Sequence, residues 1–99
     1  MKRVELSNGR IRITGEMTVH TAAELQPALI KALSKAKGAA SLDLASVEEF
    51  DSAGLQLLLA SVRDATANGA NLRILAASAA VREVVELCQR ADLLRDVAA

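Results

Sequence analysis

An acid, a hydroxyl and a glycine stand together just before the most apolar segment of the sequence, as Asp51, Ser52 and Gly54. Apolar residues then recur at steps of three and four, which predicts a helix from Ser52 to about Asn68, preceded by a short connection at residues 46–50. We expect Asp51 to cap this helix and Ser52 to lie in its first turn with its hydroxyl near the surface. Gly54 would let another backbone approach the helix closely.

Phosphorylation is one chemistry that fits Ser52. The first N–H groups of a helix have no intrahelical partner and the helix dipole is positive there, so a phosphate would be tolerated. It would add a charge of about −1.5 to −2 close to Glu48, Glu49 and Asp51, and would repel a partner docked over the helix without reshaping the fold. The alternative is that this pair of residues only caps the helix.

Catalysis by Ser52 is not indicated. The sole histidine is His20, and nothing in the sequence places it as a base for Ser52. The serine also lacks the Gly-x-Ser-x-Gly elbow of hydrolases. A single cysteine excludes an internal disulfide and a multi-cysteine metal site. We therefore expect no enzyme, no cofactor and no metal, and we expect Cys88 to be a buried structural thiol.

The composition limits the class of protein. Ninety-nine residues fit one domain, 1–99, and a 52% hydrophobic content is ample for a core, which must be aliphatic because there is one Phe and no Tyr or Trp. Twelve basic and twelve acidic residues balance, and with so few aromatic rings nucleic acid is disfavoured as a partner. Neither a signal peptide nor an apolar span of about 20 residues is visible, so we expect a cytosolic protein without membrane insertion.

The strand patterns predict the fold class. A first hairpin turns at Asn8-Gly9, residues 14–18 end its second strand, and buried strands follow at 40–45 and 72–76. The last three strands are each separated by a helix, which favours parallel crossovers. The sequence therefore predicts an α/β fold with a small mixed, mainly parallel sheet and helices packed on one face. The expected order is strand-strand-helix-strand-helix-strand-helix.

The sequence leaves open where the first helix begins and which structure the closing segment adopts. Thr21 and Glu24 fit a capping box at the start of the first helix, and Gly38 fits its end. Pro27 then lies beyond the first turn, so the helix either kinks there or starts later. Residues 92–94 begin a closing segment that is either a strand or a helix.

Three stretches carry a resemblance to a known family: "ITGEMTVHTAAEL", "SLDLASVEEFDSAGLQLLL" and "ANLRILAASAAVREVVELCQRADLL". Together they resemble the STAS family, the bacterial anti-sigma-factor antagonists and their relatives, over essentially the whole chain. The resemblance implies an α/β layer with a mainly parallel sheet and helices on one side. It also implies that Ser52 is the serine that a cognate serine kinase, the anti-sigma factor, phosphorylates, with Asp51 as the acid beside it.

The resemblance further implies how such a protein works. The unphosphorylated form binds the kinase and frees the sigma factor, and a phosphatase resets it. Thr18 and Ala53 depart from the family, which often has an acid and a hydroxyl at those positions. The alternative is a constitutive subunit of a phospholipid-trafficking ABC transporter, bound to its ATPase, or of a chemotaxis-associated signalling complex. The expected partner-binding residues are Asp51, Ala53, Gly54, Glu16, His20 and Glu49.

Overall fold

The structure, a computed structural model, describes residues 3–36 and 39–97. The predicted helix end at Gly38 lies outside these residues. The elements follow in the order β1 (Val4–Ser7), β2 (Arg10–Ile13), β3 (Gly15–Met17), α1 (Ala22–Ala36), β4 (Ala39–Leu44), β5 (Val47–Phe50), α2 (Ser52–Ala67), β6 (Asn71–Ala77), α3 (Ala79–Leu87) and the short 3₁₀ helix η1 (Ala91–Leu94).

The main sheet has four strands in the order β1-β2-β4-β6. β1 and β2 form an antiparallel hairpin, while β2 with β4 and β4 with β6 are parallel. Asn8 and Gly9 both have positive φ, 51° and 78°, as a tight two-residue hairpin turn requires. The predicted mixed, mainly parallel sheet and its first turn are confirmed.

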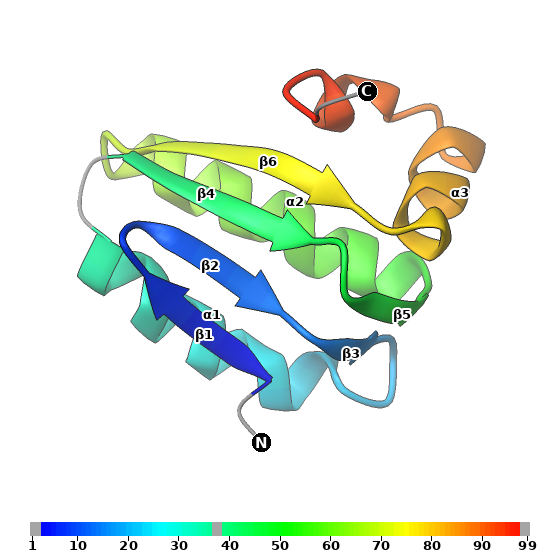
Figure 1. The fold of residues 1–99 in the computed structure, drawn as a ribbon, viewed down its shortest axis with the longest axis horizontal. Coiled ribbons are helices and arrows are strands. Elements are labelled where there is room, and N and C mark those ends of the chain that lie inside the picture. Colours follow the sequence, from blue (N-terminus) through cyan, green and yellow to red (C-terminus); the bar gives the residue numbers. More distant parts are fainter. Residues whose placement is uncertain (1–2, 37–38, 98–99) are drawn as a thin grey trace.

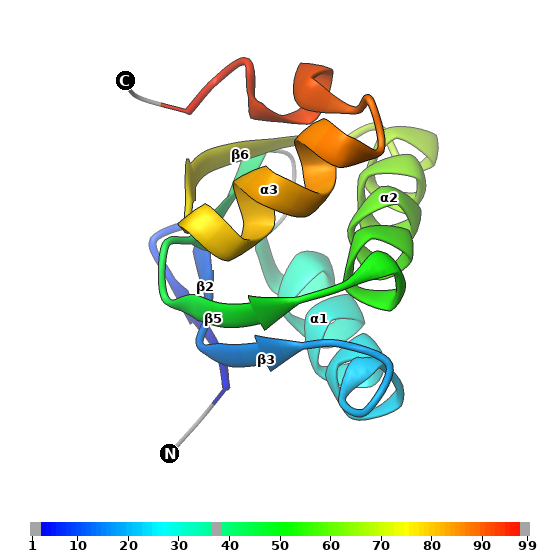
Figure 2. The ribbon, with the colours of Figure 1, turned by 90° about the vertical axis from the view of Figure 1, so that its right-hand side faces the viewer.

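The helices and the sheet form two layers. α1 and α2 lie on one face of the main sheet, and no helix of the described residues covers the opposite face (Figures 1 and 2). α3 packs chiefly against β5, beyond the carboxyl ends of the central strands (Figure 2). The prediction of helices on one face is confirmed, with α3 placed toward the end of the layer.

Two short strands were not predicted. β3 and β5 pair in parallel as a separate two-stranded sheet, so residues 14–18 do not end the second strand and residues 46–50 are not a mere connection. Gly15, with a φ of 91°, stands where the chain passes from one sheet to the other. In β5 the buried residues are Val47 and Phe50, three apart, so the strand lacks the alternation that sequence patterns detect.

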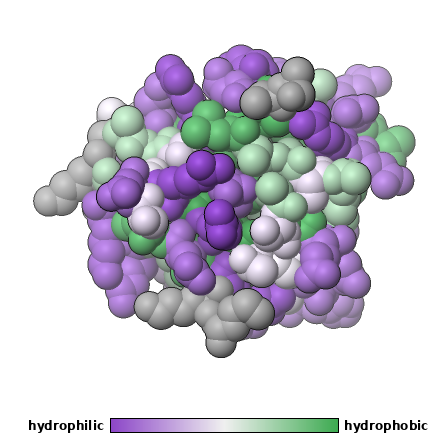
Figure 3. Space-filling model, viewed as in Figure 1, coloured by the Kyte–Doolittle hydropathy of each residue, from purple (hydrophilic) through white to green (hydrophobic). Residues whose placement is uncertain are grey.

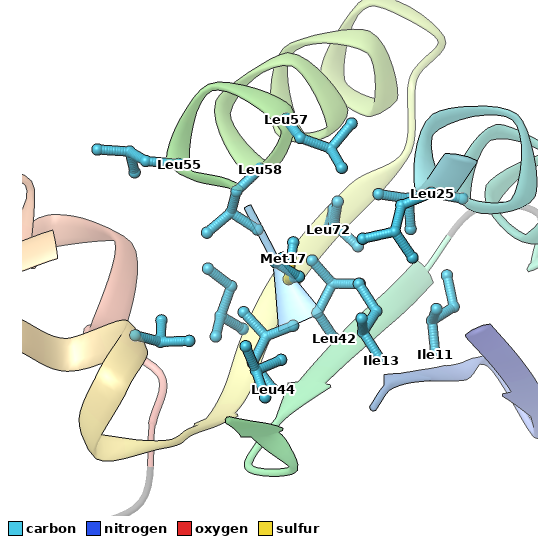
Figure 4. Packing of buried hydrophobic residues seen from close by; sticks show 14 of the residues in the cluster. Ile11, Ile13, Met17, Leu25, Leu42, Leu44, Leu55, Leu57, Leu58 and Leu72 are labelled. Carbon is cyan, nitrogen blue, oxygen red and sulfur yellow. The ribbon is translucent and has the colours of Figure 1, made fainter. Parts of the chain in front are cut away.

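The core between the layers is aliphatic (Figure 4). Burying one such side chain fully is worth about 1.5–3 kcal/mol relative to leaving it in water. This packing fixes the carboxyl ends of the strands, from which the loops of the candidate site emerge. The fully buried side chains include Ile11, Ile13, Met17, Leu25, Leu29, Leu42, Leu44 and Leu58.

The uncovered face of the sheet is polar at its centre. Asp43 is only 4% exposed, yet one of its carboxylate oxygens lies 3.1 Å from the Arg10 guanidinium and 3.5 Å from that of Arg12. The other oxygen accepts from the backbone N–H of Ala45 at 3.0 Å. Figure 3 looks onto this face and shows hydrophilic side chains over its middle. The buried charge is therefore paired, and it ties β2 to β4.

The start of α1 differs from the predicted capping box. The Thr21 hydroxyl accepts from the Thr18 N–H at 3.0 Å and donates to the Glu16 carbonyl at 2.9 Å. The Glu24 N–H instead bonds the Thr21 carbonyl, at 3.1 Å. The capping-box prediction is wrong because this hydroxyl organises the preceding loop. α1 nevertheless begins before Pro27 and continues through it.

Two predictions concern the segment after α3: the burial of Cys88 and the structure of residues 92–94. Cys88 is exposed at the C-cap of α3, so the expected buried thiol is wrong. The closing segment is the 3₁₀ helix η1, and its Leu93 and Leu94 pack half-buried against the core.

Candidate functional site

The N-terminus of α2 is built around the carboxylate of Asp51. One of its oxygens, Oδ1, accepts from the backbone N–H groups of Ala53 at 2.9 Å and Gly54 at 3.2 Å. Ser52 is the first residue of α2 and is exposed. The predicted placement is confirmed, and since Asp51 makes the capping bonds, the cap does not depend on Ser52.

The second oxygen of Asp51 holds a different part of the chain. Oδ2 accepts from the backbone N–H of Val19 at 3.0 Å, which joins the loop between β3 and α1 to the start of α2. The hydrogen bond from Val19 is the largest cause that lowers the pKa of Asp51. The N–H groups of Gly54 and Ala53 and the charge of His20 lower it further, and partial burial opposes them.

The loop from Thr18 to Thr21 places two exposed side chains in this region, those of Val19 and His20. Val19 is 68% exposed, which makes it one of the few large apolar side chains at the surface of the described residues. Thr18, where the resemblance expects an acid, is 7% exposed. Its hydroxyl donates to the Glu16 carboxylate and accepts from the His20 N–H at 3.2 Å. Thr18 therefore orders the loop from within.

An acidic edge adjoins the helix. Glu16 of β3 and Glu49 of β5 are register partners across the small sheet, and Glu48 beside them is exposed. β5 runs directly into α2, so Glu49 precedes Ser52 by three positions. The structure thus brings Glu16, Glu49 and Asp51 to the same end of the fold, with Glu16 on β3 rather than in a loop.

Gly54 lies where α2 packs closely against the backbone of β3. It is buried, and a Cβ placed on it would lie 2.2 Å from the Met17 carbonyl oxygen and 3.0 Å from the Phe50 ring. Real Cβ atoms essentially never approach so closely, so only glycine lets α2 lie against β3. The backbone that approaches Gly54 is the chain's own, so Gly54 positions α2 against β3.

Sequence reasoning missed Val19. It lies 32 residues from Asp51 in the chain, and no local pattern signals a hydrogen bond of that kind. Its apolar side chain at an exposed loop position was the only available hint.

Residues 3–36 and 39–97 contain no group of three or more His, Cys, Asp or Glu side chains that could hold a metal ion. None of their helices combines the length and apolar character needed to cross a membrane.

Comparison with known families identifies the class of protein. The family model described as "Mlab, STAS domain" matches residues 1–95, and the chain belongs to this STAS domain family. No curated protein matches the chain.

Solved structures show the same fold. An anti-sigma factor antagonist from Mycobacterium paratuberculosis has a TM-score of 0.73 at 25% identity, over 90% of this chain and 77% of that one. The anti-sigma factor antagonist SpoIIAA in its unphosphorylated form has a TM-score of 0.70 at 21% identity, over 91% and 82%. The phosphorylated form of the Bacillus cell fate determinant SpoIIAA has a TM-score of 0.64 at 20% identity, over 91% and 85%.

Proposed function

We propose that this protein is a phosphorylation-gated binding module that resembles an anti-sigma-factor antagonist. Its partner is a serine kinase that acts as an anti-sigma factor in the cytoplasm, Ser52 is the phosphoacceptor, and a phosphatase restores the unphosphorylated form. The module itself performs no catalysis. One observation carries the proposal: Ser52 is exposed at the start of α2 while Asp51 alone makes the capping bonds. A kinase can therefore modify the hydroxyl without removing the cap.

The charges around Ser52 explain how a phosphate would act. Asp51 is adjacent, and Glu49 and Glu48 precede it on β5. A phosphate would bring a further charge of about −1.5 to −2 to an already acidic edge. A partner docked over the helix start would meet this charge at close range, while the buried core would be untouched.

A second candidate is a constitutive subunit, for example the partner of a phospholipid transporter's ATPase. The observation that favours it is Val19, whose apolar side chain is 68% exposed beside the helix start. An apolar contact through Val19 would be non-directional and would not require a particular charge state of Ser52. In this case Ser52 is an interface residue and no switch operates.

The experiment compares three baits in a pull-down from the native cell: wild type, Ser52→Ala and Ser52→Asp. The first candidate predicts that wild type and Ser52→Ala retain a serine kinase, which Ser52→Asp releases. Ser7→Asp is the matched control, because it adds the same charge to an exposed residue of β1 at the opposite end of the sheet. Equal retention of one partner by all baits contradicts the switch, and if that partner is an ATPase it supports the second candidate.

A further inference from the structure

A groove lies between α1 and α2, and its lining on α2 begins at Leu57, beyond the end that carries Ser52. Figure 2 shows the two helices side by side. The volume of the groove is about 510 Å³, within the range of about 300–1,000 Å³ typical of binding pockets. On α2 and its C-cap the lining residues recur at steps of three and four from Leu57 to Asn68, which corresponds to about 16 Å along the helix axis. On α1 the facing stripe includes Ile30 and Ser34.

The body of the groove is aliphatic. Ile30, 54% exposed, belongs to its wall, and the nearly buried Leu57, Ala65 and Ala40 line it further in. The chain's one phenylalanine is not among the lining residues. Such a surface suits the aliphatic side chains of an occupant better than a planar ring that needs aromatic stacking.

Four polar side chains besides Asp64 line the groove, those of Gln26, Ser34, Ser61 and Asn68. The hydroxyls of Ser61 and Ser34 already donate to backbone carbonyls of their own helices, at 2.8 and 2.9 Å, and the Asn68 amide does so at 2.9 Å. Asp64 is the only charged residue among the described residues of the lining. Among the residues that the structure describes, no ion pair involves its carboxylate. Asp64 therefore favours an occupant that brings a positive charge.

We propose that this groove binds an amphipathic helix of a partner protein, with a row of aliphatic side chains along the groove and an Arg or Lys that faces Asp64. Recognition of a helix by a groove uses this arrangement of apolar anchors at helical spacing. A groove of about 16 Å accommodates about three helical turns, so three such anchors fit. Asp64 lies twelve residues after Ser52, about 18 Å along α2, so this second contact does not depend on the proposed switch.

The test uses two synthetic amphipathic peptides of about 20 residues, because isolated helices shorter than about 12–15 residues are marginal in water. Both peptides carry leucines at the same helical spacing. In the arginine peptide the leucines are flanked by arginines, and in the glutamate peptide they are flanked by glutamates. Binding is measured by fluorescence anisotropy, and the site is mapped by amide chemical shifts of the ¹⁵N-labelled protein. Size-exclusion chromatography with light scattering is run first to determine the oligomeric state.

The arginine peptide should bind, shift the amides of Ile30, Ser61 and Asp64, and leave those of the Ser52 region unchanged. Ala60→Trp, which fills the groove, should abolish binding. Asp64→Asn should weaken it about fivefold, the equivalent of an exposed ion pair of about 1 kcal/mol. The matched control, Glu83→Gln, removes an exposed acid from α3 and should have no effect.

Three results would overturn the proposal. The first is absence of binding, or shifts confined to the region of Val19 and Ser52. The second is equal binding of both peptides, which would show that Asp64 does not pair with a positive charge of the occupant. The third is a dimer that Ala60→Trp dissociates, because a second copy of the chain would then occupy the groove. Ser52→Asp should leave peptide affinity unchanged, so this test and that of the switch fail separately.

Discussion

At the scale of single residues, Asp51 joins two parts of the site, because one oxygen caps α2 and the other binds the Val19 N–H. Asp51→Ala should lower the free energy of unfolding by about 1–2 kcal/mol at neutral pH, the usual cost of losing an N-cap. Urea denaturation measures the difference. Asp51→Asn separates the two contacts, since its amide oxygen can still cap the helix while its NH2 group cannot accept from the Val19 N–H. An alanine variant as stable as wild type would show that the cap contributes nothing.

The same carboxylate predicts a pH dependence. The folded-state pKa of Asp51 lies below its ordinary value of 3.8, chiefly because of the Val19 N–H. Its contribution to stability is therefore complete above that value and is lost as the pH falls through the lowered folded-state pKa. The stability difference between wild type and Asp51→Ala should be constant near neutrality and shrink in strong acid. A difference that grows on acidification would reverse the assigned sign.

Gly54 provides a test of close packing. Alanine in a helix is ordinarily more favourable than glycine by about 0.8–1 kcal/mol. At this position the new Cβ would lie 2.2 Å from the Met17 carbonyl oxygen, so α2 must move away from β3. Gly54→Ala should therefore destabilise the protein by about 1–3 kcal/mol, as overpacked sites do. Thermal or urea denaturation checks this, and a stabilised variant would contradict the contact.

At the scale of elements, the β3–β5 sheet pairs two acids, Glu16 and Glu49. Like charges opposite each other on neighbouring strands destabilise, by about 0.2–1 kcal/mol. Glu49→Gln should raise the free energy of unfolding at low ionic strength, and the gain should fade in high salt. Glu48→Gln, on the same strand but without a registered acidic partner, should change stability less. Equal gains from both variants would mean that only net charge matters.

The elements also show what the sequence could predict. The helix from Ser52, its cap and the Asn8-Gly9 turn were predictable because periodicity and capping act over a few neighbouring residues. The parallel order followed from strands that alternate with helices. β3 and β5 were missed because they are three and four residues long and lack alternation. The hydrogen bond between Asp51 and Val19 was also missed, because it joins residues that only the tertiary fold brings together.

At the scale of the whole molecule, the prediction is that charge at Ser52 acts locally. Ser52 is exposed, and the core beneath it is closed by buried aliphatic side chains such as Leu55 and Leu58. The chain also shares its fold with SpoIIAA in both unphosphorylated and phosphorylated forms. In Ser52→Asp, amide chemical shifts should therefore change near residues 49–56 and 18–21.

The amides of β6 and α3 should keep their shifts in the same spectra, and the thermal midpoint should stay close to that of wild type. A negative charge at a helix N-terminus is favourable by about 0.3–1 kcal/mol, which argues against any loss of stability. Shifts that spread into β6 and α3 would mean that the sheet has two arrangements biased by Ser52. The switch would then act through the fold, and a partner could sense it at a distance from the charge.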